Sequence, residues 1–269
     1  MSVWLSGDIY GDPSRFSKDS FYEQKDFSGS KDENFIIILG DFGLVWNKDI
    51  ENGNEKFWLD WLERKPFTTL FVDGNHSNHK RLSEYPIKEW HGGKVHEIRS
   101  HVLYLMRGEI FEIEGKKFFA FGGASSHDIQ DGILDIEDKD WKKKAKALDK
   151  QGKYMYRIKG VSWWPEELPN EEEMRNGISN LQKENNKVDY IITHSPSTLE
   201  LYLMGGGMYK PDILTNYLEE IKNTVEYKAH YFGHMHCNRA KAHYFGHMYC
   251  NRAVTIKDIC LYEQIIRII

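Results

Sequence analysis

Short apolar runs recur along the chain, and several of them stop at a glycine followed by a polar residue. Runs of this length that are rich in β-branched and aromatic residues are typical of buried strands. The pair Glu114-Gly115, between two of the runs, is typical of a hairpin turn. The pattern predicts strands at residues 3–5, 35–39, 69–72, 102–105, 109–113, 117–121, 188–192 and 229–232, and a last β-rich run at 259–269.

Helical periodicity separates many of these runs. Residues 54–64 are expected to be helical. Asn170 is a suitable cap for a helix with glutamates in its first turn, and Pro211 is expected to open another helix. The polar stretch 13–33 predicts loop or loose helix, and the Lys/Asp-rich stretch 136–152 predicts an exposed helix or excursion. The buried face of the first helix is expected to carry Phe57, Trp58, Trp61 and Leu62.

Strands and helices alternate at both ends of the chain, and short hairpin strands lie in the middle. This order predicts two stacked sheets with helices outside, in a single α/β domain spanning 1–269. Ligands of open α/β sheets bind beyond the carboxyl ends of the strands. Five predicted strand ends carry polar donors there: Asp8, Asp41, Asn75 with His76, His194, and His234 with His236.

These donors are hard oxygens and imidazoles, which suit Mn, Fe or Zn and not a thiolate site. Six of them are too many for one tetrahedral zinc, so they indicate two metals that share a carboxylate. Two ions about 3.5–4 Å apart are the usual clamp for hydrolysis of a phosphate ester. The six candidate metal ligands are Asp8, Asp41, Asn75, His194, His234 and His236.

At these residues the chain resembles the calcineurin-like metallophosphoesterases. Other stretches, such as FTTLFVDGNH and SWWPEELP, are similar to a bacterial, Firmicutes-type branch of that family. Single Gly-Asp pairs are weak signals, but five motifs in the family's order form a strong one. The five are Gly7-Asp8-Ile9-Tyr10-Gly11, Gly40-Asp41-Phe42-Gly43, Gly74-Asn75-His76, Thr193-His194 and Gly233-His234-Met235-His236.

The resemblance implies a four-layer α/β/β/α sandwich of two mixed sheets flanked by helices. It implies a phosphoesterase that hydrolyses phosphomonoesters or phosphodiesters by attack of a metal-bound hydroxide. The cofactors would be two divalent metal ions, Mn, Fe or Zn, with Mn favoured. The substrate would be a phosphorylated small molecule or protein.

The resemblance also implies a role for each donor. Asp8 and His236 would hold the first metal, and Asp41 would bridge both ions. His76 would not be a ligand; it would lie over the phosphate and protonate or stabilise the leaving oxygen, a role that suits an imidazole. The second metal would be held by Asn75, His194 and His234.

The sequence departs from the family pattern at two motif positions. Tyr10 stands where the family has a histidine; a phenolate can ligate iron or manganese, whereas a neutral phenol is a poor ligand, and the second interpretation is preferred. Ser77 stands where an acidic residue is usual, which affects how its neighbours are oriented. These changes motivate an alternative function, a degenerate member with weak or no catalysis that acts as a binding scaffold.

A third departure is a tandem duplication of thirteen residues at 228–253, whose copies differ only where His236 corresponds to Tyr249. The fold has room for one such strand end. If the first copy occupies the site, it supplies His234 and His236. If the second copy does, it supplies His247 and Tyr249. A surface insertion of this length costs only a few kcal/mol, so we expect metal binding to favour the first copy.

Composition narrows the remaining possibilities. The net charge of −5 and the lack of a basic, aromatic-interleaved stripe disfavour a nucleic-acid partner. Three cysteines, two of them duplicates of one position, form no disulfide framework and suit a reducing compartment. With no signal peptide and no run of about 20 apolar residues, we expect a cytoplasmic protein without membrane contact. His127, in a polar loop, is expected to be solvated.

Overall fold

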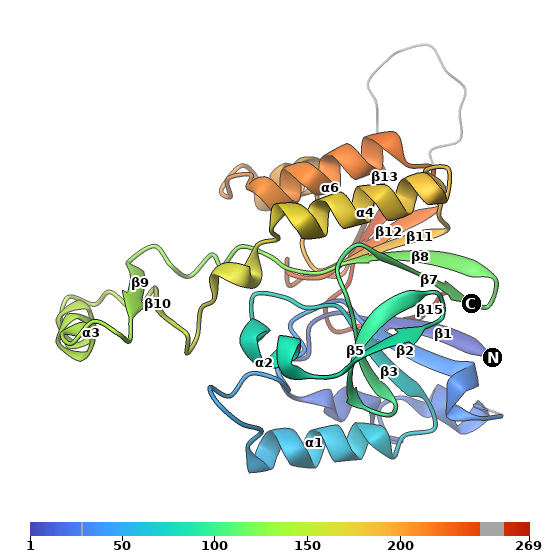
Figure 1. Cartoon of the computed structure of the whole chain (residues 1–269), viewed down its shortest axis with the longest axis horizontal. Coiled ribbons are helices and arrows are strands. Elements are labelled where there is room, and N and C mark those ends of the chain that lie inside the picture. Colours follow the sequence, from blue (N-terminus) through green and yellow to red (C-terminus); the bar gives the residue numbers. More distant parts are fainter. Residues whose placement is uncertain (28, 243–255) are drawn as a thin grey trace.

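The computed structural model describes residues 1–27, 29–242 and 256–269. Its body consists of two sheets stacked face to face, with helices on both outer faces (Figure 1). The predicted four-layer α/β/β/α sandwich is confirmed. The helices are α1 (Gly53–Glu63), α2 (His79–Glu84), α3 (Trp141–Lys150), α4 (Glu171–Lys183), α5 (Thr198–Gly205) and α6 (Ile213–Thr224).

The first sheet has seven strands in the order β15-β1-β2-β3-β6-β5-β4. Its centre is parallel from β1 to β6, and its outer pairs are antiparallel. A parallel centre explains the continuous apolar runs, because both faces of these strands are buried. The strands are β1 (Ser2–Ser6), β2 (Asn34–Ile38), β3 (Thr68–Phe71), β4 (Ile87–Trp90), β5 (Gly93–Arg99), β6 (Val102–Leu105) and β15 (Ile265–Arg267).

The second sheet has six strands in the order β13-β14-β12-β11-β8-β7. Its four central strands are also parallel, and β13 and β7 pair antiparallel at the edges. The strands are β7 (Glu109–Ile113), β8 (Lys116–Phe121), β11 (Tyr190–Thr193), β12 (Ala229–Phe232), β13 (Arg239–Ala242) and β14 (Ile256–Cys260).

The period-two geometry of the strands divides their side chains between separate cores. On β2, Phe35 and Ile37 face the core between the sheets, whereas Ile36 and Ile38 face the core under α1. A third core lies between the second sheet and the helices α4 and α6, which cover its outer face. The fold therefore buries both faces of each sheet. The carboxyl ends of the central strands stay available to carry functional side chains.

Several local predictions hold. The turn between β7 and β8 has Glu114 at φ 53° and Gly115 at φ 65°, the pair of positive angles that a two-residue hairpin favours. Asn170 caps α4 through a capping box with Glu173. Residues 136–152 contain α3, and all residues of that helix are at least partly exposed.

Other local predictions are wrong. Phe57 is 56% exposed, because Leu59 packs inward in its place beside Leu62. Asp212, and not Pro211, caps α6. The hairpin of β4 and β5 and the helix α5 were not predicted. The last β-rich run is divided between β14 and β15 in different sheets, whereas the loose helix predicted for 13–33 is present as three short 3-10 helices.

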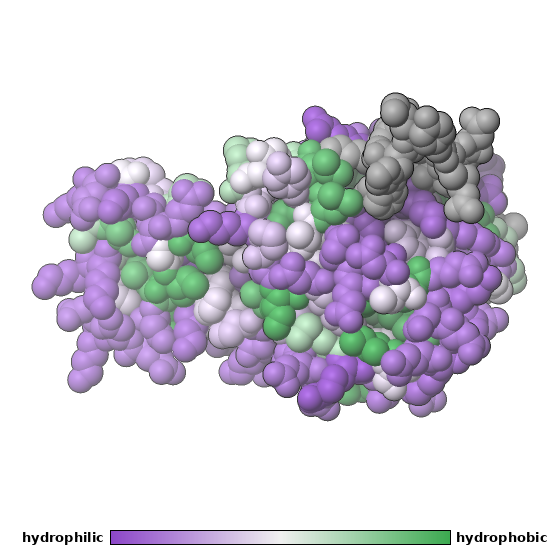
Figure 2. Space-filling view, turned by 90° about the horizontal axis from the view of Figure 1, so that it is seen from above, coloured by the Kyte–Doolittle hydropathy of each residue, from purple (hydrophilic) through white to green (hydrophobic). Residues whose placement is uncertain are grey.

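One segment stands apart from the sandwich. The strands β9 (Gly132–Asp135) and β10 (Tyr156–Lys159) pair in parallel and, with α3, form an arm that projects from the body (Figure 1). Figure 2 shows that the arm is largely hydrophilic, with hydrophobic residues gathered on one part of its visible face. The base of the arm adjoins the cavity described below, because Arg157 on β10 lines that cavity.

Candidate metal centre

All six candidate ligands lie together, although they come from five strand ends in two sheets. Asp8 follows β1, Asp41 follows β2, and Asn75 follows β3 in the first sheet. In the second sheet, His194 follows β11, and the pair His234 and His236 follows β12. The carboxyl ends of these strands meet at one edge of the sandwich, where a cavity of about 320 Å³ opens. The sequence pattern that suggested this convergence is therefore matched by the geometry.

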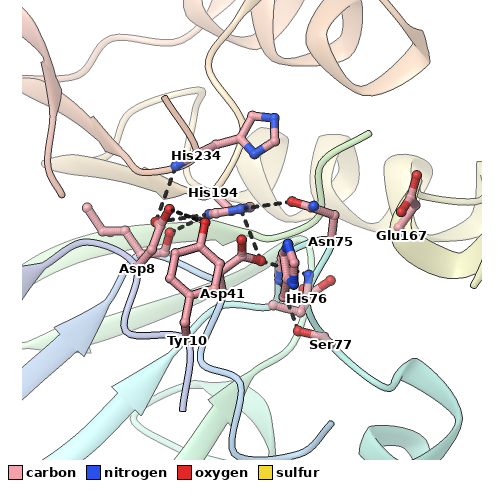
Figure 3. Close-up of polar contacts among 12 residues, drawn as sticks. Asp8, Tyr10, Asp41, Asn75, His76, Ser77, Glu167, His194 and His234 are labelled. Carbon is pink, nitrogen blue, oxygen red and sulfur yellow. Dashed lines mark hydrogen bonds and ion pairs between the residues drawn. The ribbon is translucent and has the colours of Figure 1, made fainter. Parts of the chain in front are cut away.

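The centre of the group is formed by Asp8, Asp41 and His194, which are all buried. One donor atom from each lies within 4.8 Å of the others. His194 Nδ1 lies 2.7 Å from the carbonyl oxygen of Leu39 and donates to it, which leaves the lone pair of Nε2 for a ligand. Nε2 lies 3.3 Å from Asp41 Oδ1 (Figure 3).

The carboxylates and the imidazole at this centre perturb one another. Burial raises the pKa of Asp8 to about 6. Burial also acts to raise the pKa of Asp41, but the imidazoles of His194 and His76 hold it below its usual range. Although burial alone would lower it, Asp41 and Asp8 raise the pKa of His194 to about 9. The group therefore holds concentrated negative charge that a cation would stabilise.

Asp41 shows most directly that a cation fits here. Its Oδ1 accepts a hydrogen bond of 2.8 Å from the backbone amide of His76. Its Oδ2 is buried and has no hydrogen-bond partner in the described parts of the chain. An unpartnered buried carboxylate oxygen is unfavourable, and a metal ion is one of the few groups that compensate for it. The donors present therefore fit a divalent metal centre.

The motif glycines allow the donors to approach one another. A Cβ atom added at Gly40 would lie 2.2 Å from Nδ1 of His194, and one added at Gly74 would lie 2.2 Å from Oδ1 of Asp41. Gly40 also has φ +93°, which side chains disfavour. Each glycine thus leaves space for a donor from a different strand end, and the strand ends interlock.

His234 and Asn75 complete the inner part of the site. The backbone amide of His234 donates to Asp8 Oδ1 at 3.2 Å, and its ring lies beside those of His194 and His127. Burial and these neighbouring imidazoles hold the pKa of His234 well below its usual range, so its ring is neutral and able to ligate a metal. Asn75 Oδ1 lies 3.3 Å from His194 Nε2.

Tyr10 and His236 lie at the rim. The hydroxyl of Tyr10 is 2.5 Å from His236 Nε2 and 3.3 Å from Asp8 Oδ2. Burial, with the nearby carboxylates of Asp41 and Asp8, raises the pKa of Tyr10, so its hydroxyl keeps its proton. The side chain of His236 is 54% exposed and stacks on Tyr262. The outer part of the site is therefore more open than the centre.

The residues after Asn75 have partners of their own. His76 Nε2 lies 2.9 Å from Nη2 of Arg157, which donates to it. Ser77 accepts a hydrogen bond of 3.2 Å from the amide of Gly74. A serine at position 77 therefore fixes the turn of its own motif, where the family's acidic residue was expected to orient its neighbours.

The first copy of the duplicated segment supplies β12, His234 and His236 to this site. His247 and Tyr249 of the second copy lie outside the described residues.

Three cavity-lining residues were not found by sequence reasoning. His127 is not simply solvated as expected, because its ring stacks at 4.0 Å on that of Tyr209 and both line the cavity. Arg157 reaches the cavity from the arm. All three residues lie outside the five donor motifs, so the spacing of those motifs does not indicate them.

A second buried group contains Glu200, His230 and Asp258. The ammonium group of Lys222 lies 2.5 Å from Glu200 and 2.7 Å from Asp258, so a side-chain cation already compensates these carboxylates. This group is a structural network of α5, α6, β12 and β14.

Comparisons with known proteins relate the chain to one family. Among solved structures, phosphopantetheinyl hydrolase from Mycobacterium tuberculosis aligns with 97% of this chain and 89% of its own, at 14% identity and a TM-score of 0.41. A search of curated proteins found no match. No helix in the described ranges is long and apolar enough to span a bilayer. The sequence model of the calcineurin-like phosphoesterases matches residues 1–238, and the chain therefore belongs to that family of metal-dependent hydrolases.

Proposed function

We propose that this protein is a phosphoesterase with two divalent metal ions, which hydrolyses phosphomonoesters or phosphodiesters. The observation that carries the proposal is the convergence of six donors: four line one cavity, and the buried Asp8 and His194 group with Asp41, whose Oδ2 is buried and unpartnered among the described residues. Such donors fit hard divalent cations, and we favour manganese. We also predict a cytoplasmic location and a phosphorylated small molecule or protein as the substrate.

The proposed ligand set divides the donors between two metal positions. Asp8 and His236 hold the first metal, since Nε2 of His236 lies 3.6 Å from Oδ2 of Asp8. Asp41 would contribute to both metal positions. The second metal is held by Asn75, His194 and His234.

When bound, the two ions supply charge stabilisation for the phosphoryl group and lower the pKa of water. The chain's own residues position the reaction. His194 is fixed in one tautomer by its bond to Leu39. His76 receives an N–H from Arg157 at Nε2, so its own proton resides on Nδ1. His76 is the proposed group that stabilises the leaving oxygen.

The test uses metal-loaded protein and two chromogenic substrates, p-nitrophenyl phosphate and bis-p-nitrophenyl phosphate. We expect two ions per chain by elemental analysis and turnover that depends on added Mn²⁺. Asp41→Asn should lose both metals and at least about 1,000-fold in kcat/KM, since it removes the bridging charge. The exposed Asp19 offers a matched control, and Asp19→Asn should change neither quantity.

Absence of turnover with Mn²⁺, Fe²⁺ and Zn²⁺ alike would contradict the proposal. One ion or none per chain, together with absent turnover, would favour the binding-scaffold alternative. The contact between Tyr10 and His236 is the feature that makes this alternative worth testing, because it engages a proposed ligand of the first metal.

A further inference from the structure

Arg157 differs from the other buried arginines in where its counter-ion lies. The described chain has three arginines that are buried, at positions 81, 107 and 157. The first two pair with Glu55 and Asp73, whose side chains are also buried. Arg157 pairs with Asp128 at 2.6 Å, and the side chain of Asp128 is 52% exposed. A buried guanidinium with an exposed counter-ion is only weakly neutralised, because water screens the carboxylate.

The guanidinium of Arg157 is fixed rigidly at the wall of the metal cavity. Nη1 donates to the carbonyl oxygens of Asn75 at 3.1 Å and Ser162 at 3.3 Å, and Nη2 lies 2.9 Å from Nε2 of His76. Nε faces Asp128. A guanidinium has five N–H groups, so one N–H of Nη2 has no hydrogen-bond partner among residues 1–27, 29–242 and 256–269.

This placement gives the cavity a positive charge beside the proposed metal ligands. Arg157 contacts both Asn75, a proposed ligand, and His76, the proposed partner of the leaving oxygen. A phosphoryl group bound between them would lie next to Nη2. Fixed donors of this kind stabilise a charge that they face, and they lose little entropy in doing so.

We propose that Arg157, delivered by the projecting arm, binds a terminal phosphoryl oxygen and makes the site selective for phosphomonoesters over phosphodiesters. This inference rests on the proposed function. A monoester carries a charge of about −1.5 to −2 near neutral pH and three terminal oxygens. A diester carries one negative charge and one terminal oxygen fewer, so it gains less from a cation beyond the two metals.

The experiment compares p-nitrophenyl phosphate with bis-p-nitrophenyl phosphate for the metal-loaded wild type and Arg157→Gln. We expect kcat/KM for the monoester to fall about 100-fold, which is typical for loss of one fixed donor. For the diester we expect a fall of less than about 10-fold, with metal content unchanged. Arg157→Lys should recover part of the monoester activity, because it keeps the charge but not the fork of donors.

Lys159 provides a matched control on the same strand, since its ammonium faces Asp135 on the exposed arm. Lys159→Gln should leave both activities unchanged. An equal loss for the two esters in Arg157→Gln, or a loss of metal, would show that Arg157 only anchors the arm and would overturn the inference. If the metal-loaded wild type hydrolyses neither ester, the proposed function itself has failed, before any variant is made.

A second variant keeps the inference testable if Arg157→Gln does not fold. Asp128 is exposed at the rim, so Asp128→Asn removes the competing anion without disturbing a core. We expect the Kd of inorganic phosphate, measured by calorimetry on the metal-loaded protein, to fall about threefold. An unchanged or higher Kd would contradict a role of Arg157 in binding phosphoryl oxygens.

Discussion

At the scale of single residues, the two proposed metal positions differ in how well their donors are enclosed. Asp8 of the first position, the proposed bridge Asp41 and His194 of the second are all buried, whereas His236 of the first position is about half exposed. Tyr10 replaces the family's histidine next to the first position. Its hydroxyl contacts His236, a proposed ligand of that position. We therefore expect the first metal to bind more weakly than the second.

Exchange of Tyr10 tests this difference. Tyr10→His adds an imidazole where the family has one, and we expect it to tighten the weaker metal by about tenfold in a calorimetric titration with Mn²⁺. Tyr10→Phe is the control that removes only the hydroxyl. It should leave metal content unchanged, because the hydroxyl keeps its proton and is not a ligand. Loss of a metal in Tyr10→Phe would contradict this assignment.

Metal binding is expected to release a proton. In the metal-free protein the pKa of His194 is about 9, so the ring is protonated at pH 7.5. Because this pKa is raised, the protonated ring stabilises the metal-free fold. The contribution is complete below about pH 6.5 and is lost as pH rises through 9. Coordination needs the neutral ring. Calorimetry in two buffers of different ionisation enthalpy should show release of about one proton at pH 7.5; no release would exclude His194 as a ligand.

At the scale of elements, the sequence was most informative where one strand or helix carries its own signal. Buried runs such as residues 35–39 identify central strands, because both of their faces are covered. The hairpin β4–β5 was not predicted because β4 is short and largely exposed and has no run of apolar residues. The six donors were found because strand ends share one edge. Arg157 was not predicted as a residue of the site, because its position there depends on how the arm packs against the body.

At the same scale, a pair of matched substitutions tests whether the first copy of the duplicated segment forms β12. His230 is buried, with Nε2 2.8 Å from Thr193 Oγ1 and Nδ1 3.1 Å from Asp258 Oδ1. His230→Ala leaves the carboxylate of Asp258 without this partner, and we expect a loss of about 3 kcal/mol in free energy of unfolding by urea. Its counterpart His243 lies outside the described residues. His243→Ala should cost less than about 0.5 kcal/mol, and the reverse order would assign β12 to the second copy.

At the scale of the whole molecule, the sandwich positions the site, and the arm projects from it near the metal cavity without belonging to its four layers (Figure 1). The duplicated segment, in contrast, contributes β12 and β13 to the second sheet. The two stacked sheets with helices outside were predicted from the sequence. The position of the arm could not be predicted, because its strands pair only with each other.

Two deletions of equal length test how the duplication bears on the site. Removal of residues 241–253 leaves the copy with His236, and removal of residues 228–240 leaves the copy with Tyr249. The two products are identical in sequence except at this position. We expect the first to keep two metals, and the second to bind the weaker metal at least about tenfold less tightly. Equal metal affinities in the two proteins would show that this position is not a ligand.

The interlocking glycines also limit how this site can change over generations. A side chain gained at Gly40 or Gly74 would displace a donor that is encoded at a distant point of the gene. Selection should therefore remove such changes, whereas the open rim at positions 10 and 236 tolerates exchange. We expect mutational drift to erode the outer metal position first and the inner one last. The tyrosine at position 10 stands at the rim, in line with that order.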